Sequence, residues 1–234
     1  MIQNRLERLK NCKPAILPSL LQCDFGDLRG EVQHLREAGV EVLHLDVMDG
    51  QFVPNLTYGM PIVAGLKKHT DMFLDAHLMI QEPAAYVDAF ADAGADMITF
   101  HIEAVGGPLQ AIEVLKQIRG RGLVAGLALN PKTALHDLDQ AIPYADGVLV
   151  MSVPAGFGGQ PFDPVAVDKL RLLRKSHPEL LLQVDGGINA DTIGDCHAAG
   201  CDLFVVGSAI FGIDDYSAAV RRLRAALQAS SSTL

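Results

Sequence analysis

The sequence contains no tryptophan, only four cysteines, and few aromatic residues, which make up 6% of its 234 positions. Cys12, Cys23, Cys196 and Cys201 are widely spaced and form no CxxC pair, so neither a disulfide framework nor a structural zinc knuckle is indicated. Basic residues are also scarce, since 19 Lys and Arg stand against 28 Asp and Glu and leave a net charge of -9. We therefore expect no nucleic-acid partner, because phosphate backbones are held by clustered Lys and Arg.

Long apolar runs are absent as well. No uninterrupted apolar run approaches the ~18 residues that a membrane span needs. The N-terminal MIQNRLERLKNCK carries charges every few residues instead of an apolar stretch followed by a small-residue cleavage site. We expect a cytoplasmic, unprocessed protein with free thiols, no membrane partner and a small-molecule partner.

Short runs rich in Val, Ile and Leu alternate with longer amphipathic stretches after the first dozen residues. Several of the amphipathic stretches end at a Gly that suits a helix C-cap. The eight runs that we interpret as strands are residues 15–20, 41–47, 72–79, 96–102, 123–129, 145–151, 180–185 and 202–207. Eight strand and helix pairs in a chain of this length predict an α/β fold of the TIM-barrel type, a (β/α)8 barrel.

The predicted barrel is a single domain over residues 1–234, with flexible ends at about 1–12 and 228–234. A composition that is 49% hydrophobic suffices for one sizeable core. The alternative fold is a doubly wound open sheet. Its usual mark, GxGxxG directly after the first strand, is absent.

The stretch EVLHLDVMDGQFVPN, residues 41–55, places polar side chains within an apolar strand. A buried carboxylate without a partner costs several kcal/mol, roughly, so such residues need a compensating group. His44 and Asp46 are two residues apart and therefore point to the same face of the strand. Other polar residues lie near the ends of further predicted strands, where a barrel carries its active-site groups. They are Ser19, His77, His101 and Asp185.

Two imidazoles and two carboxylates that arrive from three strands suit Zn²⁺ or a related divalent metal. The expected metal ligands are His44, Asp46, His77 and Asp185. We expect His101 to be a satisfied core residue instead, because a lone His on an apolar strand more often has that role.

Three methionines and one further acid occupy the same strand ends. We expect these methionines, Met48, Met79 and Met151, to fill gaps in the core. The alternative is that they form an apolar floor of the active site, beneath a planar reaction intermediate. Asp49 followed by Gly50 indicates a turn. The alternative is that Asp49 supports the metal ligands from outside the ligand set.

Three glycine-rich segments follow the last three predicted strands, PAGFGGQ at 154–160, DGGI at 185–188 and GSAIF at 207–211. Glycines let backbone N–H groups approach an anion, and a helix beginning at Ser208 would add its dipole. Three such segments in succession favour a phosphate site over simple tight turns, and this is where barrels commonly bind phosphate. The first segment is also long enough to act as a mobile lid.

Asp46 and Asp185 approach the barrel centre from well-separated strands. A substrate between them could lose a proton on one face and regain it on the other, while a bound metal stabilises the enediolate formed in between. We expect the two acids to titrate as a coupled unit. The alternative is that both acids serve only as metal ligands.

The motifs HLDVMDGQFVPN, DAHLM, GFGGQPF, VDGGI and VGSAIF, in this order, resemble the ribulose-phosphate 3-epimerase family. The resemblance extends from about Ala15 to about Ala226. It implies a metal-dependent isomerase of the pentose phosphate pathway that interconverts D-ribulose 5-phosphate and D-xylulose 5-phosphate by inversion at C3. It also implies one divalent metal; we expect Zn²⁺, with Fe²⁺, Mn²⁺ and Co²⁺ as alternatives that the ligand types do not separate.

The resemblance also assigns roles to individual residues. Asp46 is the expected proton acceptor and Asp185 the donor for one direction, and both belong to the expected ligand set with His44 and His77. The expected substrate contacts, most of them around the phosphate, are Ser19, His77, Gly156, Phe157, Gly158, Gly159, Asp185, Gly186, Gly187, Gly207 and Ser208. By analogy with related barrels we expect a homo-oligomer.

Two departures from the family's usual pattern stand out. Pro154 and Ala155 replace the customary Asn and Pro before GFGGQ, and we expect a slightly looser lid because Ala frees a backbone torsion that Pro fixes. The first strand reads ILPSLLQCDF where IAPSILSADF is common, which leaves Ser19 in place.

Three other functions remain as alternatives. The same chemistry could act on allulose 6-phosphate. A metal-dependent decarboxylase or lyase would need a Lys near the acids of the second or third strand, and HLDVMDGQF and DAHLM contain none. A catalytically silent sugar-phosphate-binding barrel would be expected to have lost an acid or a ligand, and all four are present.

Overall fold

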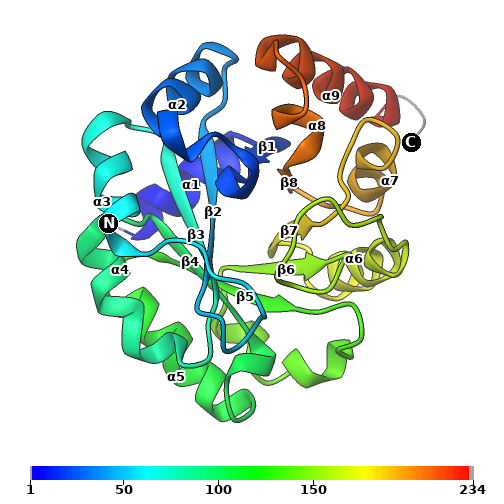
Figure 1. Ribbon diagram of the computed structural model, residues 1–234. Helices are drawn as coiled ribbons and strands as arrows, with labels where there is room; N and C mark the ends of the chain where they lie inside the picture. The colour runs from blue at the N-terminus through cyan, green and yellow to red at the C-terminus, as the bar shows by residue number, and fades with distance from the viewer. Residues whose placement is uncertain (1, 232–234) are drawn as a thin grey trace.

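Eight parallel strands form a nearly closed barrel with helices around it in the computed structural model, which describes residues 2–231 (Figure 1). The hydrogen-bonded order is β1-β8-β7-β6-β5-β4-β3-β2, and a parallel bridge between Ser19 and His44 joins the two ends of this order. The strands are β1 (Ala15–Pro18), β2 (Val42–Met48), β3 (Phe73–Met79), β4 (Met97–His101), β5 (Val124–Leu129), β6 (Gly147–Met151), β7 (Leu181–Asp185) and β8 (Leu203–Val206). The predicted barrel is confirmed, and the open sheet is excluded.

Helices surround the barrel and cover one of its ends. They are α1 (Ile2–Asn11), α2 (Leu28–Glu37), α3 (Met60–His69), α4 (Val87–Ala93), α5 (Pro108–Gly120), α6 (Val165–Ser176), α7 (Ile193–Ala198), α8 (Ser208–Phe211) and α9 (Tyr216–Ser231). Short 3-10 turns stand at η1 (Leu20–Gln22), η2 (Phe25–Asp27), η3 (Pro83–Tyr86), η4 (Ile102–Ala104), η5 (Leu135–Leu138) and η6 (Ile142–Tyr144). None of the helices in residues 2–231 is both long and apolar enough to cross a membrane.

The fifth crossover departs from the expected strand and helix pairing. Between β5 and β6 the chain forms only η5 and η6. Pro143 lies in the first turn of η6, and a proline at this point could not continue a helix from the residues before it. The carbonyl oxygens after β5 have no helix to supply their hydrogen bonds, and Lys169 on α6 supplies them instead. Its Nζ donates to the carbonyls of Asn130, Pro131 and Thr133 at 2.7 to 3.0 Å.

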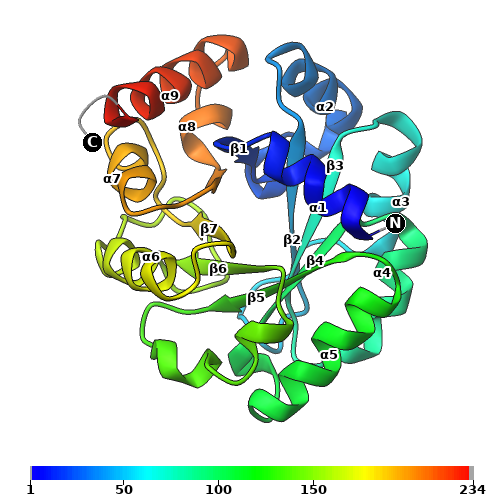
Figure 2. The same ribbon diagram turned by 180° about the vertical axis from the view of Figure 1, so that it is seen from behind.

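The N-terminal end of the barrel is closed by apolar side chains. Their lowest layer consists of Val42, Phe73, Met97, Val124, Leu181 and Leu203. Helix α1 lies across this end of the barrel, and its Leu9 joins the layer with 0% of its surface exposed (Figure 2). Burying this leucine stabilises the position of α1 by roughly 2 kcal/mol. The flexibility expected for residues 1–12 stays a prediction.

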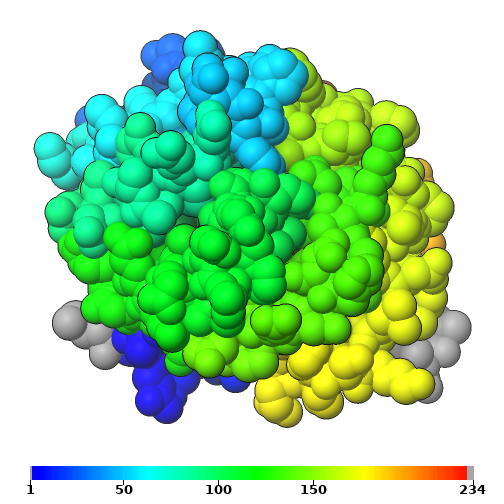
Figure 3. Space-filling view, turned by 90° about the horizontal axis from the view of Figure 1, so that it is seen from below, coloured from blue at the N-terminus to red at the C-terminus, as the bar shows by residue number. Residues whose placement is uncertain are grey.

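The two ends of the barrel differ in what covers them. In the space-filling view from the side, the blue N-terminal helix lies at one end, and loops coloured cyan and yellow-green lie at the other (Figure 3). Residues 228–231 of the expected C-terminal frayed end belong to α9, and residues 232–234 lie outside the described part of the chain.

Strand alternation divides β2 between two environments. Leu43, Leu45 and Val47 belong to the apolar core between sheet and helices. His44 and Asp46 point the other way, into the barrel, and both are buried. The barrel interior therefore changes from apolar at its N-terminal end to polar above it, and the polar layers build the site.

Candidate active site

Strands β2 and β3 bring the first three expected metal ligands together. In their parallel register Asp46 lies opposite His77, and His44 lies opposite Asp75. Asp185 ends β7 on the other side of the barrel. One donor atom from each of His44, Asp46, His77 and Asp185 lies within 4.8 Å of the others.

The spacing of these donors fits a divalent metal. His44 Nε2, Asp46 Oδ1 and His77 Nδ1 form a triangle with sides of 3.2 to 3.3 Å. Ligand atoms about 2.1 Å from one ion are separated by about 3.0 Å in an octahedral arrangement and about 3.4 Å in a tetrahedral one. Two imidazole nitrogens with carboxylate oxygens can therefore converge on one cation without rearrangement of β2 and β3.

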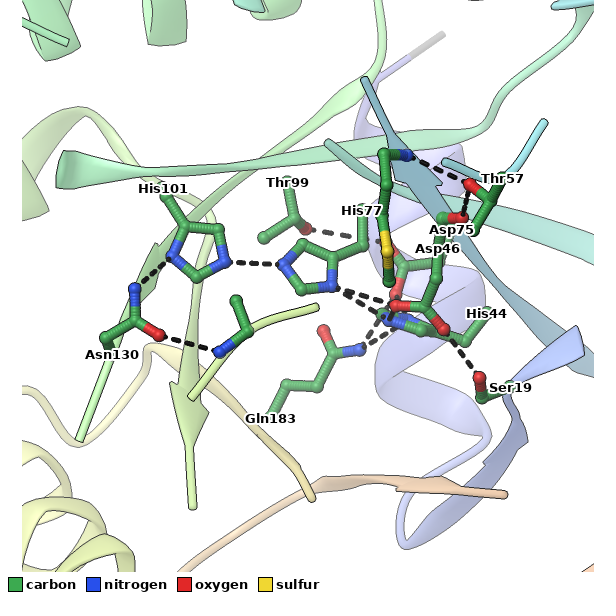
Figure 4. A network of polar contacts seen from close by, with 12 residues as sticks. Ser19, His44, Asp46, Thr57, Asp75, His77, Thr99, His101, Asn130 and Gln183 are labelled. Atoms are coloured by element: carbon green, nitrogen blue, oxygen red, sulfur yellow. Dashed lines mark hydrogen bonds and ion pairs between the residues drawn. The ribbon is translucent and has the colours of Figure 1, made fainter. Parts of the chain in front are cut away.

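The orientation of His44 depends on two residues that the sequence analysis missed. His44 Nδ1 lies 2.8 Å from Asp75 Oδ2, and Gln183 Nε2 donates to the same oxygen at 2.8 Å (Figure 4). A carboxylate that accepts from Nδ1–H leaves the Nε2 lone pair free for a metal. The signal was present in DAHLM, since Asp75 and His77 are two residues apart and share a face of β3.

His77 is held in the same way, but by another histidine. Its Nε2 lies 2.9 Å from Nε2 of His101, whose Nδ1 lies 3.1 Å from Glu103 Oε2 (Figure 4). Burial lowers the pKa of both imidazoles, so both stay neutral. His101 is buried and hydrogen-bonded, as expected, but its partner is a candidate metal ligand, which the sequence did not indicate.

Asp46 is fixed from three directions. Its Oδ2 accepts a hydrogen bond from Ser19 Oγ, and its Oδ1 faces His44 and His77. Thr57 Oγ1 donates to the Asp46 carbonyl at 2.6 Å and accepts from the N–H of Met48, which holds the end of β2 in place. The carboxylate is therefore preorganised before any ligand enters.

The two acids have pKa values displaced in opposite directions. Burial alone would raise the pKa of Asp46, but His44 and His77 outweigh it and hold that pKa well below its usual range. Burial, reinforced by the charge of Asp46, raises the pKa of Asp185 to about 7. The pKa of His44 is raised well above its ordinary value, because Asp46 and Asp75 outweigh the effect of its burial. Near neutral pH one acid is therefore ionised while the other can hold a proton, which is what an acid and base pair requires.

One pocket contains both acids and the expected substrate-binding residues. Its lining includes Ser19, Asp46, Gly156, Phe157, Gly158, Gly159, Asp185, Gly186, Gly187, Gly207 and Ser208. His44 and His77 lie beneath it and are fully buried. Met48, Met79 and Met151 also line it, which favours the apolar floor over simple gap filling.

The turn expected at Asp49 is confirmed. Asp49 Oδ1 accepts from the backbone N–H groups of Gln51 and Phe52, and Oδ2 accepts from the N–H of Gln81. The side chain therefore shapes the loop after β2 and joins it to the loop after β3. Its hydrogen bonds do not extend to the candidate ligands.

The glycines after β7 are required by their backbone and surroundings. Gly186 and Gly187 have φ of 109° and 61°, where a side chain is strained. A Cβ at Gly187 would also lie 2.6 Å from the backbone nitrogen of Phe162. The loop after β7 can therefore pass close to the backbone at Phe162 only because Gly187 has no side chain.

The expected lid over residues 154–160 is tied to neighbouring loops. Asn55 Nδ2 donates to the Gly156 carbonyl at 2.8 Å, and Gln160 Nε2 donates to the carbonyls of Pro154 and Phe157. The N–H of Ala155 donates to Asn130 Oδ1 at 3.0 Å. Proline has no N–H and could not make this bond, so the bond gives Ala155 a restraint that the customary Pro would lack. This restraint acts against the looser lid that we expect from Ala155, and the effect on lid motion stays a prediction.

A model of the ribulose-phosphate 3 epimerase family matches residues 15–211 of this chain. The chain belongs to the ribulose-phosphate 3-epimerase family. A ribulose-phosphate 3-epimerase of Mycobacterium tuberculosis is 45% identical over 222 residues, which cover 93% of this chain and 95% of that protein. The cytoplasmic isoform of rice is 41% identical over 92% of this chain and 95% of that protein. The family resemblance found in the motifs is thus confirmed, and the chain is an enzyme of the ribulose-phosphate 3-epimerase family.

Solved structures support the barrel of this family member. A 3-hexulose-6-phosphate synthase matches with a TM-score of 0.73 and 20% identity, covering 91% of this chain and 99% of that one. A 3-keto-L-gulonate-6-phosphate decarboxylase of Vibrio cholerae matches with a TM-score of 0.72 and 19% identity, covering 93% and 98%. At this identity the likeness establishes the fold alone.

Proposed function

We propose that this family member interconverts D-ribulose 5-phosphate and D-xylulose 5-phosphate by inverting the configuration at C3. The observation that carries the proposal is the pairing of Asp46 and Asp185. Both line one pocket, they come from β2 and β7, and their pKa values are displaced in opposite directions. Inversion at a carbon next to a carbonyl needs one base and one acid on opposite faces of the substrate.

The proton transfers follow from these two states. The ionised Asp46 takes the proton from C3, and the electrons of the broken C3–H bond form the C2–C3 double bond of an enediolate, with the charge on the carbonyl oxygen. Asp185 then donates its proton to the opposite face of C3, and the C2 carbonyl re-forms. Asp46 now holds a proton and Asp185 is ionised, which is the starting state for the reverse direction.

The four-residue ligand set supports a metal-dependent reaction. A divalent metal held by His44, Asp46, His77 and Asp185 would polarise the substrate carbonyl and offset the charge that develops on its oxygen. Asp75 accepts a hydrogen bond from Nδ1 of His44, which leaves Nε2 to face that point and to bind the metal once its proton has left. We propose Zn²⁺ as the ion, with Fe²⁺, Mn²⁺ and Co²⁺ as alternatives.

The remaining lining matches a phosphorylated ligand with a planar reacting centre. The glycines of the lid, of the β7 loop and of the β8 loop line the pocket and offer backbone N–H groups to an anion. Met48, Met79 and Met151 present apolar surface next to the acids and limit the access of water to an enediolate.

The test is an assay of the metal-loaded protein with D-ribulose 5-phosphate and, in parallel, allulose 6-phosphate, each with an EDTA-treated control. We expect rapid turnover of the pentose phosphate that is lost with the metal and regained when it returns. Turnover of the hexose phosphate alone would contradict the substrate, and turnover of neither would favour a silent binding barrel. Decarboxylation is not expected, because no Lys lines the pocket in the described part of the chain.

Two further proposals concern the protein's setting. We propose a homo-oligomer, from analogy with related barrels, and a cytoplasmic location, because the similar rice protein is a cytoplasmic isoform. Analytical ultracentrifugation of the purified chain tests the first, and fractionation of cells that express it tests the second.

A further inference from the structure

The proposed reaction requires the pocket to hold a phosphate dianion, yet its lining contains no Lys or Arg among residues 2–231. The side chains in the lining that can donate a hydrogen bond are Ser19, Gln22, Gln160 and Ser208. Ser19 already donates to Asp46, and Gln160 donates to two carbonyls of the lid. Gln22 and Ser208 are left to supply side-chain donors to the anion.

Gln22 occupies a position between the two glycine-rich loops. It ends η1, directly after β1, and its carboxamide reaches both the lid and the loop after β8. A Cβ at Gly158 would lie 2.3 Å from its Nε2, and a Cβ at Gly207 would lie 2.9 Å from its Oε1. Both glycines therefore leave room for this carboxamide.

The carboxamide of Gln22 makes no hydrogen bond to any other residue that the structure describes, although it lies within the pocket. An amide group placed against backbone and left without a partner is available to a ligand.

We infer that Gln22 is a substrate-binding residue whose NH₂ group donates to the phosphate and links the lid to the β8 loop. The inference rests on the proposed function for the identity of the substrate, and it concerns a residue that the motifs did not single out. Where the family commonly has Ser in this motif, the longer Gln spans from η1 to Gly158. A bound phosphate would then contact three separate segments of the chain through one side chain and two loops.

Gln22 could instead only fill space, and the variant Gln22→Met distinguishes this role from phosphate binding. Methionine keeps the length and approximate volume of the side chain but removes the donor. We expect Gln22→Met to raise the Kd for inorganic phosphate and the KM for D-ribulose 5-phosphate by about ten-fold, with kcat nearly unchanged. Gln22→Glu should weaken both further through like-charge repulsion, and Gln33→Ala, on the exposed face of α2, should match the wild type.

The experiment measures phosphate binding by calorimetry and steady-state kinetics on the metal-loaded protein at constant ionic strength, with the melting temperature as a check on folding. Unchanged Kd and KM in Gln22→Met would overturn the inference, as would a fall in kcat alone. The two proposals fail separately. A wild type that binds phosphate through Gln22 but does not turn over the pentose phosphate contradicts the function only, and normal turnover with an unaffected Gln22→Met contradicts the inference only.

Discussion

His77 Nε2 and His101 Nε2 lie 2.9 Å apart beneath the pocket floor. Two neutral imidazoles can share one hydrogen bond at this distance only if one donates and the other accepts. Glu103 decides which, because its carboxylate accepts from Nδ1–H of His101 and leaves the Nε2 of His101 as the acceptor. His77 must then donate from Nε2, which leaves its Nδ1 lone pair directed at His44 and Asp46.

Glu103→Gln tests this relay. A neutral amide can donate to His101 Nδ1 and thereby reverse both tautomers, so we expect the affinity for a divalent metal to fall by about ten-fold or more. Competition with a chromophoric chelator measures it. Glu113→Gln, an exposed change on α5, is the matched control. Equal metal affinity in the two variants would show that Glu103 does not orient the ligand.

Replacing Asp46 or Asp185 should stop turnover, and replacing Asp185 should leave the binding of phosphate unchanged. We expect Asp185→Asn and Asp46→Asn each to lower kcat by about a thousand-fold or more, because amides cannot exchange the proton. Inorganic phosphate should bind Asp185→Asn as it binds the wild type. Asp195→Asn, exposed on α7, controls for a general loss of surface charge. Substantial turnover by Asp185→Asn would assign the acid role to another group.

The raised pKa of Asp185 predicts how the metal-free protein responds to pH. Its pKa is about 7 in the folded chain against an ordinary value of 3.8, so the folded state must ionise a buried carboxyl above pH 7 and is destabilised there. That cost is lost as the pH falls from 7 toward 3.8. Metal-free Asp185→Asn should therefore unfold at higher denaturant concentration than the wild type at pH 8, and the difference should shrink at pH 5. A difference that is constant with pH would mean that burial does not shift Asp185.

Metal binding should stabilise the folded wild-type protein. A ligand at about one hundred times its Kd stabilises the folded state by about 2.7 kcal/mol, which raises the Tm of a chain this long by roughly 5–10 °C. We expect this rise in the wild type on adding Zn²⁺ after EDTA treatment, and none in His44→Ala. Scanning calorimetry measures both. A wild-type Tm that is indifferent to every divalent ion tested would contradict the assignment of the ligand set.

Much of the site was predictable because strand periodicity is local. His44 and Asp46 are two residues apart, and a barrel brings the ends of its strands together, so the four candidate ligands could be named without coordinates. Asp75 shows the limit of that approach. It has the same spacing from His77, but it lies one layer deeper in the barrel, and only the register of β2 with β3 shows that it supports His44.

Other features depend on contacts between distant parts of the chain. The sequence predicts a flexible end at residues 1–12 and does not show that Leu9 is buried in the layer that closes the barrel. Ala155 suggested a freer hinge, yet its N–H reaches Asn130, which lies 25 residues earlier. Gln22 is an uncharged residue of the first strand's motif, and only the folded chain brings it against Gly158 and Gly207. Local sequence holds no information on such pairs.

The fate of the hydrogen at C3 tests the two-acid account most directly. The metal-loaded protein would be incubated with D-ribulose 5-phosphate in heavy water, and deuterium at C3 of each sugar would be followed by NMR. The account predicts D-xylulose 5-phosphate that carries deuterium at C3, with no exchange into either sugar in Asp46→Asn. Product that forms at the normal rate and retains the original hydrogen at C3 would contradict proton exchange through Asp46 and Asp185.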